Sequence, residues 1–272
     1  MFEKALVALD LSPAEYPILA CLPALQQWGV RHLLLTHVIE FGYTHSSALA
    51  HQQDYIDWLE KCAQPLRAAG LTVEVQVRTS GVVADEILQA AGDFAADLIV
   101  VGSRGQNLLS KLFLGSAARG VIHKSTLPIL LEWIEPSAAA TQARCEAVCT
   151  DTLRHILFAT DFSPQADAAA QAVTELAQRA QQVDCVHVLA DTGAEAAARA
   201  DLTRQLQALG DKAQGRLLHG KVASTIAQHA QEHNASLIVV GKHGQNWAAS
   251  QVIGSTAANL CEIAGRPVLM VP

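Results

Sequence analysis

Two glycine-rich segments have the residue types and the spacing of a phosphate-binding loop. Gly102-Ser103-Arg104-Gly105 is followed after nine residues by Gly115-Ser116, and Gly241-Lys242-His243-Gly244 is followed after nine residues by Gly254-Ser255. Glycines allow a backbone to turn tightly and to lie close to a ligand. A Gly-Ser pair that opens a helix also presents unpaired N–H groups and the positive end of the helix dipole. The chemistry predicted for both segments is therefore phosphate binding.

Each loop needs a strand before it and an acidic residue near it. The apolar runs at residues 98–101 and 237–240 predict buried strands that end at a glycine. Asp10 and Asp161 follow the first predicted strand of each half, and each is followed by a Ser-Pro pair. Because Ser caps a helix and Pro suits the first helical position, a helix should begin directly after each acid.

The sequence contains the same domain twice. Residues 81–133 align with residues 220–272 without a gap, and residues 8–13 align with residues 159–164. The segment between these matches is shorter in the second copy. We therefore predict one domain at residues 1–133, a linker at residues 134–152 and a second domain at residues 153–272.

Predicted strands alternate with predicted helices in both copies, which indicates an α/β fold with a doubly wound, five-stranded parallel sheet and helices on both faces. Ligands bind such sheets outside the carboxyl ends of the strands, where the strand order reverses. Asp10 or Asp161 should meet the glycine loop there, where it could accept a hydrogen bond from a ribose or base or help to hold Mg²⁺. The alternative is that each aspartate only accompanies the Ser-Pro helix start.

Composition excludes several classes of partner and location. The 272 residues are 50% apolar and have a net charge of −7, which argues against charge-driven binding to nucleic acid or membranes. No apolar run approaches the roughly 20 residues of a membrane span. The apolar run near the N-terminus is too short for a signal peptide. Six cysteines without the spacing of a disulfide framework predict reduced thiols in a cytoplasmic protein.

Other motifs give weaker signals. The sequence has neither a Walker loop nor a G-x-G-x-x-G motif, which disfavours P-loop enzymes and dinucleotide enzymes. His229 and His233 lie in an H-x-x-E-H pattern, but a third zinc ligand is missing, so we interpret them as histidines on a solvent face. His37 and His187, near the ends of the second strands, are interpreted as structural histidines that could also line the cleft. No pair of nucleophile and base stands out.

The pattern Gly-x₂-Gly-x₉-Gly-Ser after a strand, with Asp-x-Ser-Pro after the first strand, closely resembles the universal stress protein family, and it occurs twice. The resemblance implies a tandem member with an adenine nucleotide alpha hydrolase-like, Rossmann-like fold and ATP at the carboxyl edge of each sheet. In the first copy it implies these nucleotide-binding residues: Asp10, Val38, Gly102, Arg104, Gly105, Gly115, Ser116 and Ala117. In the second copy it implies Asp161, Val188, Gly241, His243, Gly244, Gly254, Ser255 and Thr256.

The same resemblance implies an ATP-binding sensor or regulator in a stress response, with slow ATP hydrolysis at most and Mg²⁺ accompanying the nucleotide near Asp10. The alternative function is a nucleotide-free interaction module that works through its dimer-like surface. An enzyme of the related adenine-binding group is disfavoured because no second substrate motif is visible.

Differences between the copies lead to two further expectations. The second copy has His243 in place of Arg104 and Ser250 in place of Lys111, so we expect it to bind phosphate more weakly. The last predicted strands of both copies, at residues 129–131 and 268–271, are apolar and lie at a sheet edge, and such edges are normally covered or paired. We therefore expect the two copies to associate as a pseudo-dimer, and the family resemblance also allows a homodimer.

Overall fold

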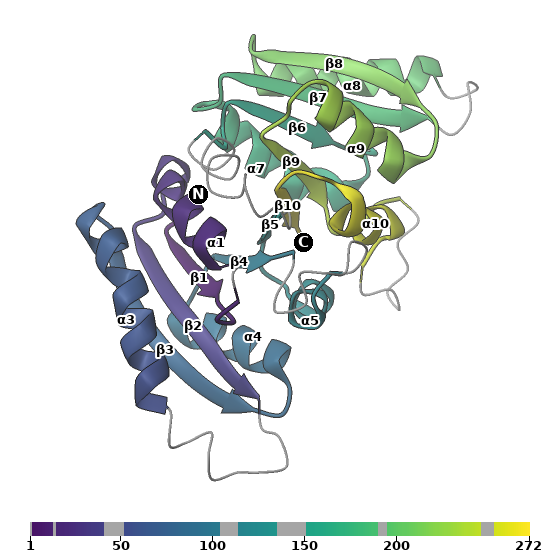
Figure 1. The fold of residues 1–272 in the computed structure, drawn as a ribbon. Coiled ribbons are helices and arrows are strands. Elements are labelled where there is room, and N and C mark those ends of the chain that lie inside the picture. The colour runs from purple at the N-terminus through teal and green to yellow at the C-terminus, as the bar shows by residue number, and fades with distance from the viewer. Residues whose placement is uncertain are drawn as a thin grey trace. The chain divides into compact units, whose positions relative to one another are not determined.

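The computed structural model describes residues 2–12, 15–40, 52–103, 114–134, 151–189, 195–245 and 253–272. The chain divides into two compact units, which we call unit 1 (Met1–Leu127 and Ile134–Thr150) and unit 2 (Pro128–Trp133 and Asp151–Pro272). Each unit has a sheet with helices on both of its faces (Figure 1). The predicted doubly wound α/β fold is therefore confirmed.

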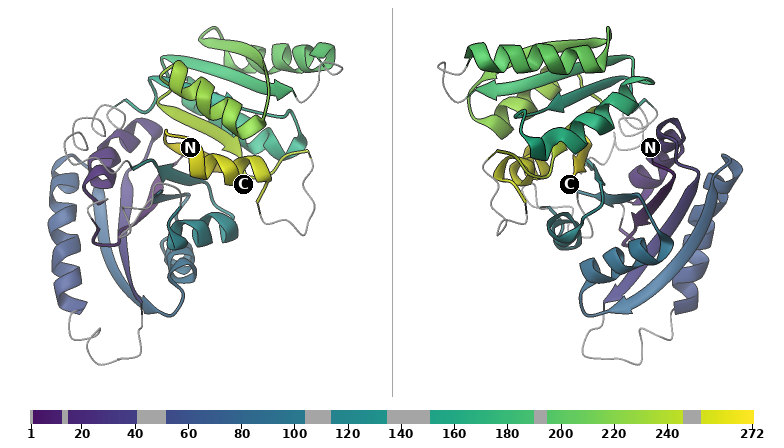
Figure 2. Two further views of the ribbon diagram at one scale, coloured as in Figure 1. Left: turned by 45° about the vertical axis from the view of Figure 1, so that its right-hand side comes forward. Right: turned by 180° about the vertical axis from the view of Figure 1, so that it is seen from behind.

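In its described residues, unit 1 has four parallel strands in the order β3-β2-β1-β4. The helices α1 and α3 lie on one face of this sheet, and α4 and α5 pack together on the other (Figure 2). The elements are β1 (Lys4–Ala8), α1 (Glu15–Cys21), the 3₁₀-helix η1 (Leu22–Trp28), β2 (His32–Glu40), α3 (Gln52–Ala68), β3 (Thr72–Ser80), α4 (Val83–Phe94), β4 (Leu98–Gly102) and α5 (Ser116–Lys124).

The described strands of unit 2 have the order β5-β10-β9-β6-β7-β8. The pairs from β10 to β8 are parallel, and β5 pairs antiparallel with β10. The elements are β5 (Ile129–Glu132), β6 (His155–Ala159), the 3₁₀-helix η2 (Pro164–Ala166), α7 (Asp167–Ala177), β7 (Gln182–Leu189), α8 (Glu195–Leu209), β8 (Ala213–His219), α9 (Val222–Glu232), β9 (Leu237–Gly241), α10 (Ser255–Ile263) and β10 (Val268–Val271).

Strand β5 is the last strand of the first copy in sequence, but it belongs to unit 2 in space. Its register places Leu131 opposite Val268 and Ile129 opposite Met270. All four strand residues of β5 and of β10 are buried. The sheet order β3-β2-β1-β4-β5 and β10-β9-β6-β7-β8 gives each sequence copy the five strands that were expected, and the apolar edge of β10 pairs with the last strand of the first copy.

The first predicted helix is split by a proline. It is α-helical only as far as Cys21 and continues as η1, which has Pro23 in its first turn. Proline has no N–H and crowds the preceding turn, so the regular helix cannot continue through it. Gly29 ends η1: its φ is 109°, and an added Cβ would lie 2.9 Å from the Phe2 carbonyl oxygen.

The central strands position the site in unit 2. Strands β6 and β9 are neighbours, with Ala159 opposite Val240. Apart from Gly241, which is half-buried, their residues are buried, as expected for strands covered on both faces. Since both strands point the same way, the chain leaves them at the same edge. Asp161 and the glycine loop after Gly241 therefore start side by side.

Two general expectations can be compared with the described residues. No helix in the described ranges is long and apolar enough to cross a membrane. Cys62, Cys185 and Cys261 are free thiols, as predicted. Cys21 is disulfide-bonded, so the prediction of six reduced thiols is wrong at this residue.

Candidate functional site

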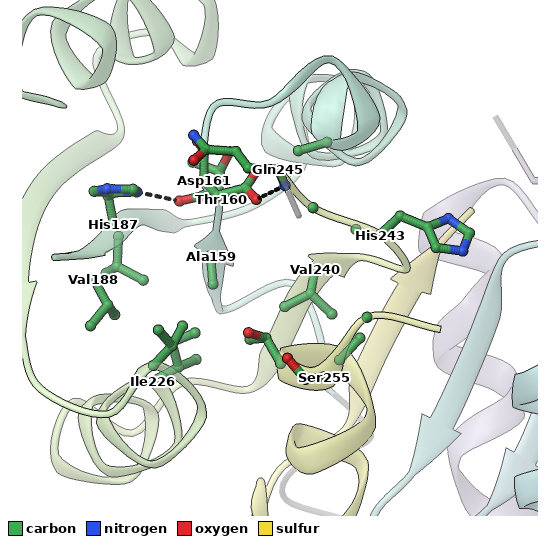
Figure 3. Close-up of a pocket in the computed structure, with 18 of the residues that line it drawn as sticks. Ala159, Thr160, Asp161, His187, Val188, Ile226, Val240, His243, Gln245 and Ser255 are labelled. Carbon is green, nitrogen blue, oxygen red and sulfur yellow. Dashed lines mark hydrogen bonds between the residues drawn. The ribbon is translucent and has the colours of Figure 1, made fainter. Parts of the chain in front are cut away.

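A cavity of about 460 Å³ lies at the carboxyl ends of the central strands of unit 2. Its walls come from the ends of β6, β7 and β9, the loop after β9 and the first turns of α9 and α10 (Figure 3). Every residue that the family resemblance implies for the second copy lines this one cavity. These residues are Asp161, Val188, Gly241, His243, Gly244, Gly254, Ser255 and Thr256.

The amino end of α10 forms one wall. Gly254 precedes this helix, and its N–H donates to the carbonyl oxygen of Lys242 at 2.9 Å, which ties the helix start to the glycine loop. No side chain caps the helix at this residue. The first N–H groups of a helix have no partner within the helix, so those of Ser255 and Thr256 are available to an acceptor in the cavity.

Asp161 fixes the loop through its carboxylate. One oxygen, Oδ1, accepts the backbone N–H of Ser163 at 3.0 Å and its hydroxyl at 2.6 Å. The other oxygen, Oδ2, accepts the backbone N–H of Gln245 at 2.7 Å, and Gln245 Nε2 donates to the Asp161 carbonyl at 2.6 Å (Figure 3). A Cβ on Gly244 would overlap the same carboxylate, so only glycine fits there. The aspartate therefore anchors both the helix start and the glycine loop.

Sequence reasoning did not assign Gln245 to the site. Its signal was present, because the pair Gln106-Asn107 of the first copy recurs as Gln245-Asn246. The contacts of Gln245 with Asp161 give a structural reason for this repeat.

His187 has the structural role that was predicted for it and also lines the cavity. Its Nδ1 lies 2.8 Å from the carbonyl oxygen of Thr160, and the Phe162 ring packs on it with 4.8 Å between centroids. Because a carbonyl only accepts, Nδ1 must carry the proton. The imidazole thus holds β7 to the turn that carries Asp161.

The other walls of the cavity are apolar. Val186 and Val188 lie two residues apart on β7 and share the face that carries α9, where Ile226 also lines the cavity. Ala159 and Val240 lie at the ends of the two central strands. Pockets for small organic ligands typically combine such walls with a few polar groups that fix orientation. The arrangement suits a molecule with one flat apolar part and one anionic part.

Charged side chains contribute less to the cavity than the sequence indicated. Figure 3 shows the His243 ring directed away from Asp161 and Ser255. Lys242 is 5% exposed, and burial lowers the pKa of its amine. The groups that this loop offers to an anion in unit 2 are therefore mainly backbone N–H groups.

Unit 1 repeats the frame of this site where it is described. The Asp10 carboxylate accepts the N–H of Ser12 at 3.1 Å, His37 Nδ1 lies 2.8 Å from the Leu9 carbonyl oxygen, and the N–H of Gly115 donates to the Ser103 carbonyl at 3.1 Å. The other predicted residues lie at the expected element ends: Val38 in β2, Gly102 at the end of β4, and Ser116 and Ala117 at the start of α5. Arg104 and Gly105 lie outside the described residues.

The structure contradicts part of the interpretation that His229 and His233 lie on a solvent face. His229 is 6% exposed and its Nε2 lies 3.5 Å from Oδ2 of the buried Asp184, whereas His233 is exposed and stacks on His229 with 3.9 Å between ring centroids. The interpretation is therefore wrong for His229. Within the described ranges, no group of three or more His, Cys, Asp or Glu side chains could hold a metal ion.

Comparison with known proteins identifies the family. The model of the universal stress protein family matches residues 1–131 and 152–272. A universal stress protein of Mycolicibacterium smegmatis is 26% identical over 219 residues, covering 74% of this chain and 69% of that protein. The universal stress protein Slr1230 of Synechocystis is 24% identical over 245 residues, covering 89% of this chain and 79% of that protein.

A solved structure shows the same fold over almost the whole chain. The crystal structure of a universal stress protein from Archaeoglobus fulgidus superimposes with a TM-score of 0.77 and 24% identity, over 98% of this chain and 97% of that one. The two matched segments of the family model coincide closely with the two sequence copies. The chain therefore belongs to the universal stress protein family, carries its domain twice in tandem, and has the stress-response role that this membership supports.

Proposed function

We propose that the chain binds an adenine nucleotide, ATP, in the cavity of unit 2 and acts as a nucleotide-dependent sensor or regulator in a stress response. One observation carries this proposal. A glycine loop, the amino end of α10 and an apolar wall meet in a single cavity of about 460 Å³. The family membership adds the stress-response context.

The residues present fit the parts of a nucleotide. The apolar wall of Val188 and Ile226 suits a planar base, and the N–H groups at the start of α10 suit phosphate. Asp161 already accepts three hydrogens from Ser163 and Gln245, so its remaining lone pair suits a ribose hydroxyl. Mg²⁺ would screen the phosphate charge, and we assign no protein ligand to it.

The proposed activity is binding and release, with slow hydrolysis at most. Asp161 is the only carboxylate among the described residues that line the cavity. Both of its oxygens already accept hydrogen bonds from the protein, so the carboxylate is held by the helix start and the glycine loop rather than directed at a water molecule. The bound and free states would then signal through the surface of the protein.

The pseudo-dimer and the cytoplasmic location belong to the same proposal. The antiparallel pairing of β5 with β10 supports an association of the two copies through their last strands. The net charge of −7 argues against binding to nucleic acid or membranes, which supports the proposed cytoplasmic location. A homodimer of this chain is compatible with the same edge chemistry.

Calorimetric titration with ATP tests the function, with Gly254→Val as the variant. A Cβ on Gly254 would lie 3.2 Å from the Lys242 carbonyl oxygen, inside the loop, so the larger side chain should weaken ATP binding by at least about tenfold, or about 1.4 kcal/mol. The matched control is Gly92→Val, because a Cβ there meets nothing within 4 Å. Absence of ATP binding, and of nucleotide in the denatured purified protein, would favour the nucleotide-free interaction module.

A further inference from the structure

The two units turn in the same way after their first strands, which allows a residue-by-residue comparison. The residue after each aspartate has a positive φ, 56° at Leu11 and 59° at Phe162. The N–H of Glu15 then donates to the Ser12 carbonyl at 3.0 Å, and the N–H of Ala166 donates to the equivalent Ser163 carbonyl at 2.9 Å. Glu15 and Ala166 therefore occupy the same position in the fold.

In unit 2 this position borders the candidate site. Ala166 lines the cavity, and a Cβ placed on Gly241 would lie 3.5 Å from the Ala166 Cα. Gly241 is the residue at which β9 enters the glycine loop. The small side chain of Ala166 thus leaves the space beside the start of the loop free of charge.

Unit 1 has a carboxylate at this position. Glu15 is 8% exposed, and its Oε1 accepts a long hydrogen bond of 3.4 Å from Trp58 Nε1. Its other oxygen, Oε2, is buried without a hydrogen-bond partner among the described residues. Burial raises the pKa of this carboxyl and the Asp10 charge raises it further, against the opposite effect of Trp58. A buried carboxylate without full hydrogen bonding is costly, and nothing in the helix alone requires it.

A second position that lines the cavity in unit 2 also differs between the units, because other side chains cover it in unit 1. His37 is the counterpart of His187, and in unit 1 the side chains of α3 cover it: the Tyr55 ring lies 4.9 Å and the Trp58 ring 5.8 Å from its centroid. In unit 2 the corresponding cover is Phe162, which comes from the turn itself. Trp58 therefore links Glu15 to His37, and the two positions that border the cavity in unit 2 are built into one cluster in unit 1.

We infer that Glu15 is a specificity-determining residue that makes unit 1 discriminate against nucleotide polyphosphates, so that unit 2 is the high-affinity ATP site. This inference rests on the proposed function. When ionised, the Glu15 carboxylate repels the phosphate chain of a nucleotide, whereas the equivalent Ala166 of unit 2 carries no charge. The inference reverses the order of affinities that the loop cations Arg104 and Lys111 predict from sequence.

Reciprocal exchange of the two residues tests the inference, with ATP and uncharged adenosine as the ligands in calorimetry. Wild type should bind one ATP per chain with high affinity, and Gly254→Val should weaken that binding by at least about tenfold. Glu15→Ala and Glu15→Gln should each add a second ATP site, because both remove the charge. Ala166→Glu should weaken ATP binding to unit 2 by about tenfold or more, whereas Ala166→Gln should weaken it less. The two variants should bind adenosine with nearly equal affinity, because adenosine carries no phosphate charge.

The outcomes separate this inference from the proposed function. Two equal ATP sites in wild type, or a Glu15→Ala variant that still binds one ATP, would overturn the role of Glu15 and leave nucleotide binding intact. Equal losses of ATP and adenosine in Ala166→Glu and Ala166→Gln would show that bulk rather than charge acts at this position, which also overturns it. No ATP binding to wild type or to any variant would remove the proposed function and the inference together. Thermal unfolding of each variant checks that both units remain folded.

Discussion

The two units share one fold but differ in the interior between their second strand and the helix that follows their third strand. In unit 2, Asp184 of β7 is fully buried, and its Oδ2 lies 3.4 Å from His155 Nε2 and 3.5 Å from His229 Nε2. In unit 1 the equivalent positions hold Leu34 and Ala90, both buried. The same backbone therefore accepts either an ionisable or an apolar interior.

One backbone contact is kept while its chemistry changes. In unit 1, Lys4 Nζ donates to the Phe94 carbonyl at 2.8 Å and lies 4.6 Å from the centre of the Phe94 ring. In unit 2, Nδ1 of the equivalent His155 lies 3.0 Å from the His233 carbonyl oxygen. Both contacts join the first strand to the end of the helix that covers it. This contact occurs in both units, whereas the buried carboxylate of Asp184 lies in unit 2 only.

The interior of unit 2 depends on the negative charge of Asp184. Burial raises the pKa of this carboxyl, but the contacts with His155, Gln182 and Arg216 outweigh burial and hold the pKa at about 2. Asp184 Oδ2, His155 Nε2, His229 Nε2 and Arg216 Nε are buried without a regular hydrogen bond among the described residues. Buried polar groups that face one another at such distances are stabilised mainly by electrostatics.

The largest expected effect comes from Asp184→Asn, which keeps the shape of the side chain and removes its charge. The imidazoles of His155 and His229 and the guanidinium of Arg216 would then face a neutral amide, so unit 2 should lose about 3 kcal/mol of stability. Chemical denaturation measures the loss. Hydrogen exchange locates it, because the amides of β6 and β7 should lose protection while those of β1 and β2 should not.

A triple variant distinguishes the charge from the position. His155→Lys, Asp184→Leu and His229→Ala together install the residues of unit 1 at the three equivalent positions. Because unit 1 packs well with these residues, the triple variant should recover most of the stability lost in Asp184→Asn. If it is less stable than Asp184→Asn, the interior of unit 2 depends on its own shape and the comparison between the units fails.

A smaller effect is expected from pH, with a sign that follows from His229. Burial lowers the pKa of this imidazole from its ordinary value of 6.5, as do the nearby His233 and Arg216, while Asp184 acts in the opposite direction. The folded state therefore binds the proton less readily than the unfolded state, so stability is complete above pH 6.5 and decreases as the pH falls below it. Asp184 adds a second loss, between its ordinary pKa of 3.8 and about 2.

His229→Ala should flatten the first of these two losses in denaturation curves recorded at several pH values. Burial also lowers the pKa of His37 in unit 1, so part of the dependence should remain. His219→Ala serves as a control because His219 is exposed on β8. An unchanged pH profile in His229→Ala would mean that the imidazole does not respond to its burial.

The candidate site was predictable because it depends on spacing that the sequence states twice. Parallel strands bring their carboxyl ends to one edge, so an acid after the first strand and a glycine loop after the fourth must meet there. The eight residues implied for the second copy line one cavity for this reason.

Other features depend on tertiary contacts that no local pattern reveals. Strand β5 belongs to unit 2 because it pairs with β10, which is far from it in the sequence. The position of Glu15 was visible, but its burial against Trp58 required the path of α3. The burial of His229 had a signal that was overlooked: it lies three residues after Ile226, on the face of α9 that packs against the sheet.

The smallest expected effect comes from Lys4→Met, which removes the cation from the Phe94 ring and its hydrogen bond in unit 1. Because the backbone N–H of residue 4 still donates to Asp97 at 3.0 Å, the strand remains anchored, and the loss should be about 0.5–1 kcal/mol. Denaturation midpoints measure it, with Lys61→Met on the exposed side of α3 as the control. A loss as large as that of Asp184→Asn would show that the contact between the first strand and its covering helix, rather than the buried charge, stabilises both units. A small loss would mean that unit 1 does not depend on this contact, in contrast to the dependence of unit 2 on a buried charge that Asp184→Asn tests.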